Sequence, residues 1–149
     1  MKEAFVTWVE GLQFVGQAGD HAVVIDSRDA EGGGQNGGPS PMELVLLGVL
    51  GCTGMDVVSI LKKKRQDVQG LKIHARAQQA ETAPNYFTHV ALEYVAFGDV
   101  EPDALGRAIE LSEVKYCSAI NTLNGKTKFS SSYRVEKVAA SARLAAIQP

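Results

Sequence analysis

The sequence predicts an α+β fold in which antiparallel strands surround one long, buried central helix. Short runs of alternating apolar and polar residues, which are typical of strands, occur before and after the middle of the chain. Between them lies an apolar stretch that begins with a helix-capping pattern and is too long for a strand. The 149 residues, 45% of them apolar, are enough for one core, and we treat residues 1–149 as a single domain.

The first part of the chain is expected to form three antiparallel strands. Gly11 and Gly19 mark the turns between them, because glycine adopts turn conformations readily. The three strands are expected at residues 3–9, 12–17 and 21–26. Residues 28–41, which include the glycine-rich run Gly32–Gly38, are expected to form a flexible loop, since glycine costs backbone entropy and proline lacks an N–H donor.

The central helix is expected to begin after this loop and to end near Arg65. Ser40 suits the N-cap, Pro41 the first helical position and Glu43 the third, which together make a capping box. Every side chain in residues 44–55 is apolar or small, so this helix has no polar face and must be buried on all sides. One sheet covers only one side of it, and the other side needs a second helix layer or a partner subunit; we predict a homodimer.

The second half of the chain is predicted to contain a long hairpin, two helices and a final strand. Pro84 marks the hairpin turn, and Glu101, Pro102 and Asp103 mark the start of the first helix. The expected elements are strands at 70–80 and 86–97, helices at 101–116 and 117–123, and a strand at 126–138. The alanine-rich tail, residues 139–149, is expected to fray.

Charge and hydropathy exclude several classes of function. A net charge of −2, with acidic and basic residues interspersed, offers no surface for nucleic acid. Residues 44–55, the longest uncharged stretch, are fewer than the ~20 needed to span a bilayer, so no membrane anchor is expected. The N-terminus lacks the apolar run of a signal peptide, which predicts a cytoplasmic protein. In that reducing compartment the two cysteines are not expected to form a permanent disulfide.

Cys52 and Cys117 are the residues best suited to carry chemistry. Cys52 lies among three glycines in residues 48–54, and each costs about 1 kcal/mol relative to alanine in a helix, so the space they leave must be needed. That space serves either close helix packing or access of a substrate to the sulfur, and a buried inert thiol is the alternative. Cys117 stands at the start of a short helix, where backbone N–H groups and Lys115 are expected to lower its pKa.

No metal or cofactor is expected from the sequence. Neither cysteine belongs to a C-x-x-C motif, and the histidines lack the spacing of metal ligands. The three histidines are His21, His74 and His89. The glycine-rich run continues as Pro39-Ser40-Pro41 instead of the Lys-Ser or Lys-Thr of a phosphate-binding loop, so a nucleotide site is not expected either.

Together these motifs resemble the OsmC/Ohr family, the osmotically inducible and organic hydroperoxide resistance proteins. The resemblance rests on GPSPMEL at 38–44, on Cys52 nine residues after Glu43, and on KYCS at 115–118. The expected order of strands and helices fits as well, to about Val138. The segment TGMDVV at 53–58 is similar to the OsmC-like branch of the family, and Cys117 lacks a following proline.

The resemblance implies an intertwined homodimer that reduces organic or inorganic hydroperoxides. Cys52 would attack the peroxide to give a sulfenic acid and an alcohol, and Cys117 would resolve it as a disulfide. A small dithiol or a lipoylated protein would then restore the thiols. In the family an arginine stabilises the thiolate and a carboxylate orients the arginine. Glu43 matches that carboxylate by motif, and Arg28, just before the glycine-rich run, is our candidate for the arginine.

Helix geometry limits what Glu43 can do. Nine helical residues place Glu43 about 13 Å from Cys52 along the axis and on roughly the opposite face, so it could serve Cys52 only across the dimer. The alternatives are a capping role for Glu43 and a solvated loop charge for Arg28. The rival function for the whole chain is a non-enzymatic dimer that binds a small apolar ligand or a partner in the same cleft.

Overall fold

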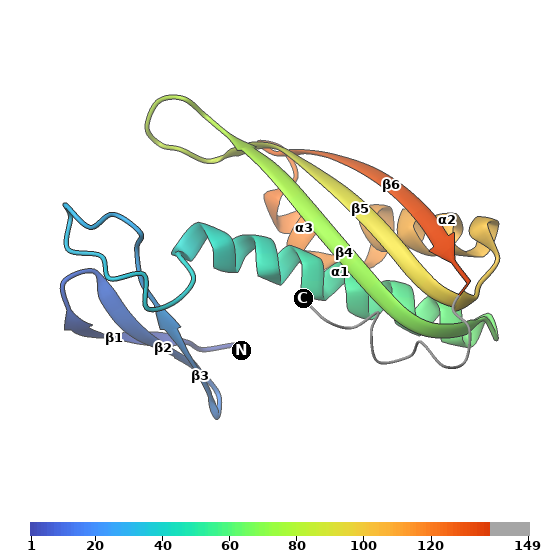
Figure 1. The fold of residues 1–149 in the computed structure, drawn as a ribbon, viewed down its shortest axis with the longest axis horizontal. Coiled ribbons are helices and arrows are strands. Elements are labelled where there is room, and N and C mark those ends of the chain that lie inside the picture. The colour runs from blue at the N-terminus through green and yellow to red at the C-terminus, as the bar shows by residue number, and fades with distance from the viewer. Residues whose placement is uncertain (138–149) are drawn as a thin grey trace. The chain divides into compact units, whose positions relative to one another are not determined.

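The computed structural model describes residues 1–137, and these divide into two compact units. The first unit is Met1–Leu47 and the second begins at Gly48. Helix α1 (Pro41–Lys63) contributes its first turns to one unit and the rest to the other (Figure 1). The expected tail at 139–149 lies outside the described residues, and the single-domain assignment stays a prediction.

The first unit contains the three-stranded antiparallel meander expected from the sequence. Strands β1 (Phe5–Glu10), β2 (Gln13–Ala18) and β3 (His21–Ile25) pair in the order β1-β2-β3 (Figure 1). This sheet exposes large apolar side chains instead of burying them. Trp8 is 63% exposed and Phe5 is 61% exposed, so the unit has little apolar core of its own.

The glycine-rich loop is held in place by the buried carboxylate of Asp26. Its Oδ2 accepts the N–H of Gly37 at 2.9 Å, and its Oδ1 accepts the N–H of Ser27 at 2.7 Å and of Gln35 at 3.4 Å. The hydrogen bonds from Gly37 and Ser27 also hold the pKa of Asp26 below its usual value. The prediction of a flexible loop missed these contacts, because composition alone does not show a buried acceptor.

Helix α1 begins with the predicted capping box. The Ser40 N–H donates to Glu43 Oε2 at 2.8 Å, and the Glu43 N–H donates to Ser40 Oγ at 3.3 Å. The helix ends at Lys63, two residues before the expected position, and Arg65 adopts a positive φ of 57°. A left-handed residue of this kind is a common way to end a helix.

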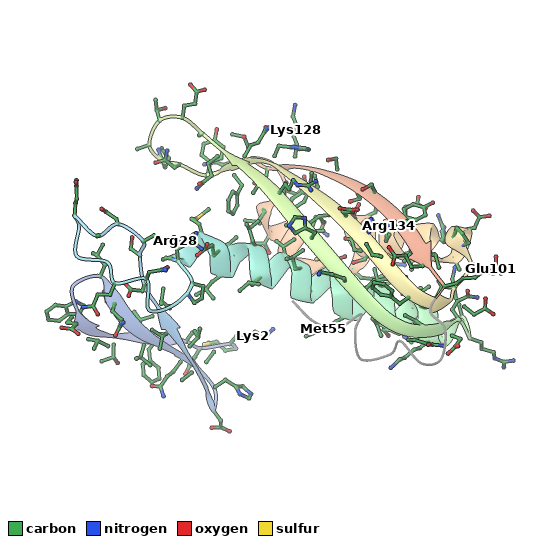
Figure 2. All side chains as sticks on the ribbon, in the orientation of Figure 1. Lys2, Arg28, Met55, Glu101, Lys128 and Arg134 are labelled. Atoms are coloured by element: carbon green, nitrogen blue, oxygen red, sulfur yellow. The ribbon has the colours of Figure 1, made fainter. Side chains whose placement is uncertain are left out.

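Only one stripe of α1 is buried in the single chain, whereas the sequence predicted burial on all sides. The buried residues repeat every four positions and are Val49, Thr53, Val57 and Leu61. Met55, by contrast, is 77% exposed on the side of α1 away from the second sheet (Figure 2). The apolar character of this helix therefore exceeds what one chain uses to fold.

The apolar character of α1 extends beyond residues 44–55. Over its most apolar 18 residues the mean hydropathy is 2.1, so among the described residues α1 is a helix long and apolar enough to cross a membrane. The core helix of a soluble protein meets the same criteria of length and composition. The stretch considered in the sequence was shorter because it stopped before Asp56, yet the helix continues to Lys63.

The second unit is built on a mixed three-stranded sheet. Strands β4 (Asp67–Gln79) and β5 (Phe87–Asp99) form the expected antiparallel hairpin, and β6 (Lys128–Glu136) pairs with β5 in parallel. The prediction of antiparallel strands is therefore wrong for β6. A parallel partner requires a long crossover, and the helices between β5 and β6 supply it (Figure 1).

The core of the second unit lies between this sheet and the helices. Val90, Leu92 and Tyr94 of β5 are buried, as are Leu61 of α1 and Leu105 of helix α2 (Pro102–Leu111). The predicted helix at 101–116 is α2 followed by a wider π-helical turn, η1 (Ser112–Tyr116), in which the Cys117 N–H donates to Ser112 O at 2.7 Å. Helix α3 (Ser118–Leu123) follows directly.

Candidate active site

The fold brings the two cysteines together within the second unit of one chain. Both are free thiols, Cys52 half-buried in α1 and Cys117 fully buried at the N-cap of α3. Their sulfur atoms and a carboxylate oxygen of Asp56 all lie within 4.8 Å of one another. Pairing of two subunits is therefore not needed to juxtapose the thiols.

Burial outweighs the start of helix α3 in setting the acidity of Cys117. Its Sγ accepts the Ile120 N–H at 3.5 Å, as expected for a residue at the start of a helix. Burial nevertheless raises the pKa of Cys117 to about 11, and the neighbouring Cys52 adds to this. The prediction of a lowered pKa was wrong, because loss of solvation outweighs the backbone hydrogen bond. Cys117 is thus a protonated thiol at neutral pH.

A chain of buried hydroxyl groups connects Asp56 to the interior of the unit. Ser112 Oγ donates to Asp56 Oδ2 at 3.0 Å, and Thr53 Oγ1 lies 2.9 Å from Ser112 Oγ. The same Thr53 oxygen lies 2.9 Å from Tyr94 Oη, which donates to Glu113 Oε1 at 3.3 Å. Burial raises the pKa of Tyr94 above its usual value, so this residue stays a phenol.

The hydroxyl groups in this chain have too few protons to donate a hydrogen bond at every contact. The hydroxyls of Ser112, Thr53 and Tyr94 provide three protons for four contacts. Because Ser112 donates to Asp56 and Tyr94 donates to Glu113, the Thr53 proton can serve only one of its two neighbours at a time. Both carboxylates consequently act as acceptors at the two ends of the chain.

Arg28 and Glu43 form an ion pair in the first unit. Arg28 Nη2 lies 2.8 Å from Glu43 Oε1, and Arg28 is labelled in the loop before α1 in Figure 2. The other oxygen of Glu43 accepts the Ser40 N–H. The hydrogen bonds from Ser40, with a smaller effect of Arg28, hold the pKa of Glu43 below its usual value. The capping role and the pairing with arginine therefore coexist, one on each carboxylate oxygen.

An open cavity of about 620 Å³ lies in the second unit. Its lining includes Ile120, whose N–H contacts the Cys117 sulfur, and Glu113, the end of the hydroxyl chain. Lys126 and Lys128 also line it. The cavity therefore includes a residue whose backbone contacts the Cys117 sulfur.

Sequence reasoning missed the polar residues around the cysteines. Asp56 was the residue that the sequence could most readily have identified. It is the one charged residue in the middle of α1, and it lies four residues after Cys52 on the same side of the helix. Ser112, Thr53 and Tyr94 carried no comparable signal, because small hydroxyl residues and a strand tyrosine are common anywhere in a fold. Among the described residues, Cys52, Asp56 and Cys117 could together hold a metal ion.

Comparison with known proteins places this architecture in one family. The model of the family described as OsmC-like protein matches residues 33–132. Protein YhfA of Escherichia coli (strain K12) is 41% identical over 135 residues, which cover 89% of this chain and 97% of that protein.

Solved structures agree with that match. A hypothetical protein from Aquifex aeolicus has a TM-score of 0.84 at 31% identity, covering 93% of this chain and 98% of that one. An organic hydroperoxide resistance protein OsmC from Legionella pneumophila has a TM-score of 0.70 at 16% identity, covering 91% and 97%, and shares the fold. The family resemblance read from the sequence is thereby confirmed, and the chain belongs to the OsmC-like protein family.

Proposed function

We propose that the chain is a thiol-dependent peroxidase that reduces organic or inorganic hydroperoxides as part of oxidative stress defence. The observation that carries this proposal is the pair of free thiols, Cys52 and Cys117, with their sulfur atoms within 4.8 Å of one another. Two thiols at this separation need only a small shift to form a disulfide. The OsmC/Ohr family, whose name includes organic hydroperoxide resistance, supports the choice of oxidant.

Burial assigns the two thiols to different steps. The half-buried Cys52 is the attacking residue, because a hydroperoxide can approach it more readily than the fully buried Cys117. Its thiolate takes the distal peroxide oxygen to give a sulfenic acid, and the departing alkoxide takes a proton to become an alcohol. The Cys117 sulfur then attacks the sulfenic sulfur, releasing water and closing the disulfide. A small dithiol or a lipoylated protein reduces this disulfide by thiol exchange.

We assign the Arg28 and Glu43 ion pair of one subunit to stabilisation of the Cys52 thiolate of the other subunit in a homodimer, following the family pattern. The 2.8 Å contact between the two side chains supports this role, since the carboxylate fixes the direction of the guanidinium.

The homodimer is part of the same proposal. The exposed apolar residues Phe5, Trp8 and Met55 support it, because a second subunit would remove them from water. We place the reaction in the cytoplasm, where reduced thiols are maintained.

The test is peroxide consumption by the reduced protein with cumene hydroperoxide and a dithiol. Wild type should consume peroxide catalytically, and Cys52→Ser should fall to the rate of the dithiol alone. Cys117→Ser should give a single rapid turnover and then accumulate a sulfenic acid that dimedone traps. Ser59→Ala, at an exposed position of the same helix, is the matched control and should keep the wild-type rate. Equal rates for wild type and Cys52→Ser would end this proposal.

A second candidate is a non-enzymatic protein that binds a small ligand, and the cavity of about 620 Å³ favours it. Its rim carries Lys126 and Lys128, which suit an anionic compound better than the apolar ligand expected from the sequence. On this alternative, peroxide consumption would be equal in wild type and Cys52→Ser. A ligand screen by thermal shift would then show stabilisation that Lys126→Ala abolishes.

A further inference from the structure

The residues around the thiols form a ligand set of a kind that transition metals use. Cys52 and Asp56 stand four residues apart on one face of α1, and Cys117 approaches from the start of α3. Each offers one ligand atom, and the three atoms lie within 4.8 Å of one another. Because Cys52 and Cys117 are 65 positions apart in the sequence, no short motif could reveal this set.

The distances fit a tetrahedral ion after a small contraction. Zinc binds sulfur at about 2.3 Å and carboxylate oxygen at about 2.0–2.2 Å, so its ligand atoms lie roughly 3.5–3.8 Å apart. Separations within 4.8 Å reach that geometry if each side chain moves by about 1 Å or less. Rotation about the side-chain torsions of Cys52 and Asp56, which are only half-buried, is sufficient for such a movement.

Two of the three ligands are already held by hydrogen bonds from neighbouring groups. Ser112 Oγ donates to Asp56 Oδ2 at 3.0 Å, and among residues 1–137 no hydrogen bond engages the other oxygen, Oδ1. The Ile120 N–H donates to the Cys117 sulfur at 3.5 Å. Donors of this kind orient metal ligands. Asp56 thus has one oxygen held by Ser112 and one oxygen without a hydrogen bond among the described residues.

The chemistry of the ligands narrows the choice of ion. Two thiolates favour zinc and other soft or borderline ions over magnesium and calcium, which prefer sets made of oxygen atoms. Three protein ligands leave a fourth tetrahedral position. The half-buried sides of Cys52 and Asp56 leave that position accessible to water or to a small ligand.

From this arrangement we propose that, in the reduced protein, Cys52, Cys117 and Asp56 bind one zinc ion per chain, with water as the fourth ligand. Binding displaces the thiol protons and brings the two sulfurs to a common ion. In the bound state both cysteines are thiolates, the form of cysteine that binds metals and that reacts with oxidants.

Oxidation of the site releases the ion. Two zinc-bound thiolates, one hydroperoxide and two protons give a disulfide, an alcohol and water; the sulfurs lose two electrons and the O–O bond gains them. A disulfide leaves Asp56 as the single remaining protein ligand, and the ion dissociates. This release rests on the proposed peroxidase function, whereas zinc binding by the reduced thiols does not.

The test is a zinc titration of the reduced full-length protein in competition with a chromophoric chelator. Wild type should bind one zinc per chain with a dissociation constant of about 1 μM or less. Cys52→Ser and Cys117→Ser should each weaken binding by about 100-fold or more. Ser112→Ala should weaken it by about 10–100-fold, the range seen when a residue that orients a ligand is removed. Cobalt in place of zinc should give a sulfur-to-cobalt charge-transfer band that both cysteine variants lack.

Asp56→Asn and Asp99→Asn form the matched pair of acid variants. Asp56→Asn should weaken zinc binding, and Asp99→Asn, at the exposed end of β5, should bind as wild type does. Should Cys117→Ser fail to fold, Cys52→Ser still decides, because its side chain is only half-buried. Absence of zinc binding by the wild type, or equal binding by wild type and Cys52→Ser, overturns the proposal. Neither result bears on peroxide consumption, which is measured without metal and in the presence of a chelator.

Discussion

The two units of the chain use their apolar residues in opposite ways. In the first unit Trp8 and Phe5 of the sheet are more than half exposed, and the buried polar group Asp26 organises the loop. In the second unit Tyr94 and Leu61 are fully buried between strands and helices, and the buried polar groups adjoin the thiols. Folding free energy from apolar burial is therefore concentrated in the second unit, which also contains both thiols.

This difference shows where a second surface is needed. A sheet on a helix layer, as in the second unit, completes its own core. A lone three-stranded sheet with apolar side chains in water does not, so its stability depends on what covers it. A homodimer, as proposed above, resolves this imbalance, and variants of the two units should respond differently to measurement.

The largest difference between the units should appear in core truncation. Leu61→Ala should lower the free energy of unfolding by about 2–5 kcal/mol, because a fully buried leucine leaves a cavity. Val24→Ala in β3, where the side chain is 39% exposed, should cost less than about 0.5 kcal/mol in the free chain. Urea denaturation of both variants gives the comparison. A cost for Val24→Ala approaching that of Leu61→Ala would show that the first sheet is covered in solution.

A smaller effect should arise from the acidity of the buried thiol. The pKa of Cys117 is raised from 9.0 to about 11 in the folded chain, so folding favours the protonated form. Its contribution is complete below pH ~9, where the unfolded thiol is protonated, and is lost as the pH rises from about 9 to 11. At about 1.36 kcal/mol per pKa unit, this loss is on the order of 2–3 kcal/mol. Unfolding of wild type and Cys117→Ala across this range should show a steeper decline for wild type, and parallel curves would contradict it.

The smallest effect should come from the cap of α1. Ser40→Ala removes the acceptor for the Glu43 N–H and should cost about 1 kcal/mol of unfolding free energy. Ser40→Asp restores an acceptor at the same position and should recover most of the loss. Thermal unfolding of the three proteins measures this difference. Equal melting temperatures for Ser40→Ala and wild type would show that the cap contributes nothing measurable to the first unit.

Much of the fold could be predicted because its signals are local. The meander, the capping box and the β4-β5 hairpin depend on alternation, turn glycines and cap residues that lie within a few positions of one another. The direction of β6 was not predictable in the same way. It depends on how α2, η1 and α3 return the chain to the same end of the sheet, and this is a property of the whole crossover.

Of the candidate site, only the reactive cysteines could be predicted from residue type and position; their surroundings could not. Residue type and position pointed to Cys52 and Cys117, and the family resemblance added Glu43 and Arg28 and the proposed roles of all four. No sequence pattern indicates that Ser112 contacts Asp56 or that burial outweighs the helix terminus at Cys117, because both depend on packing across distant segments. How far a given thiol is removed from solvent, in particular, is not indicated by the order of residues in the sequence.

Ser112 contacts the surroundings of both candidate metal ligands, Asp56 and Cys117, through different atoms. Its hydroxyl donates to Asp56, and its carbonyl oxygen accepts the Cys117 N–H across the five-residue turn. Ser112 therefore contacts both Asp56 of α1 and Cys117 at the start of α3. A shift in the position of Ser112 would therefore act on the Asp56 carboxylate and on the Cys117 backbone at once.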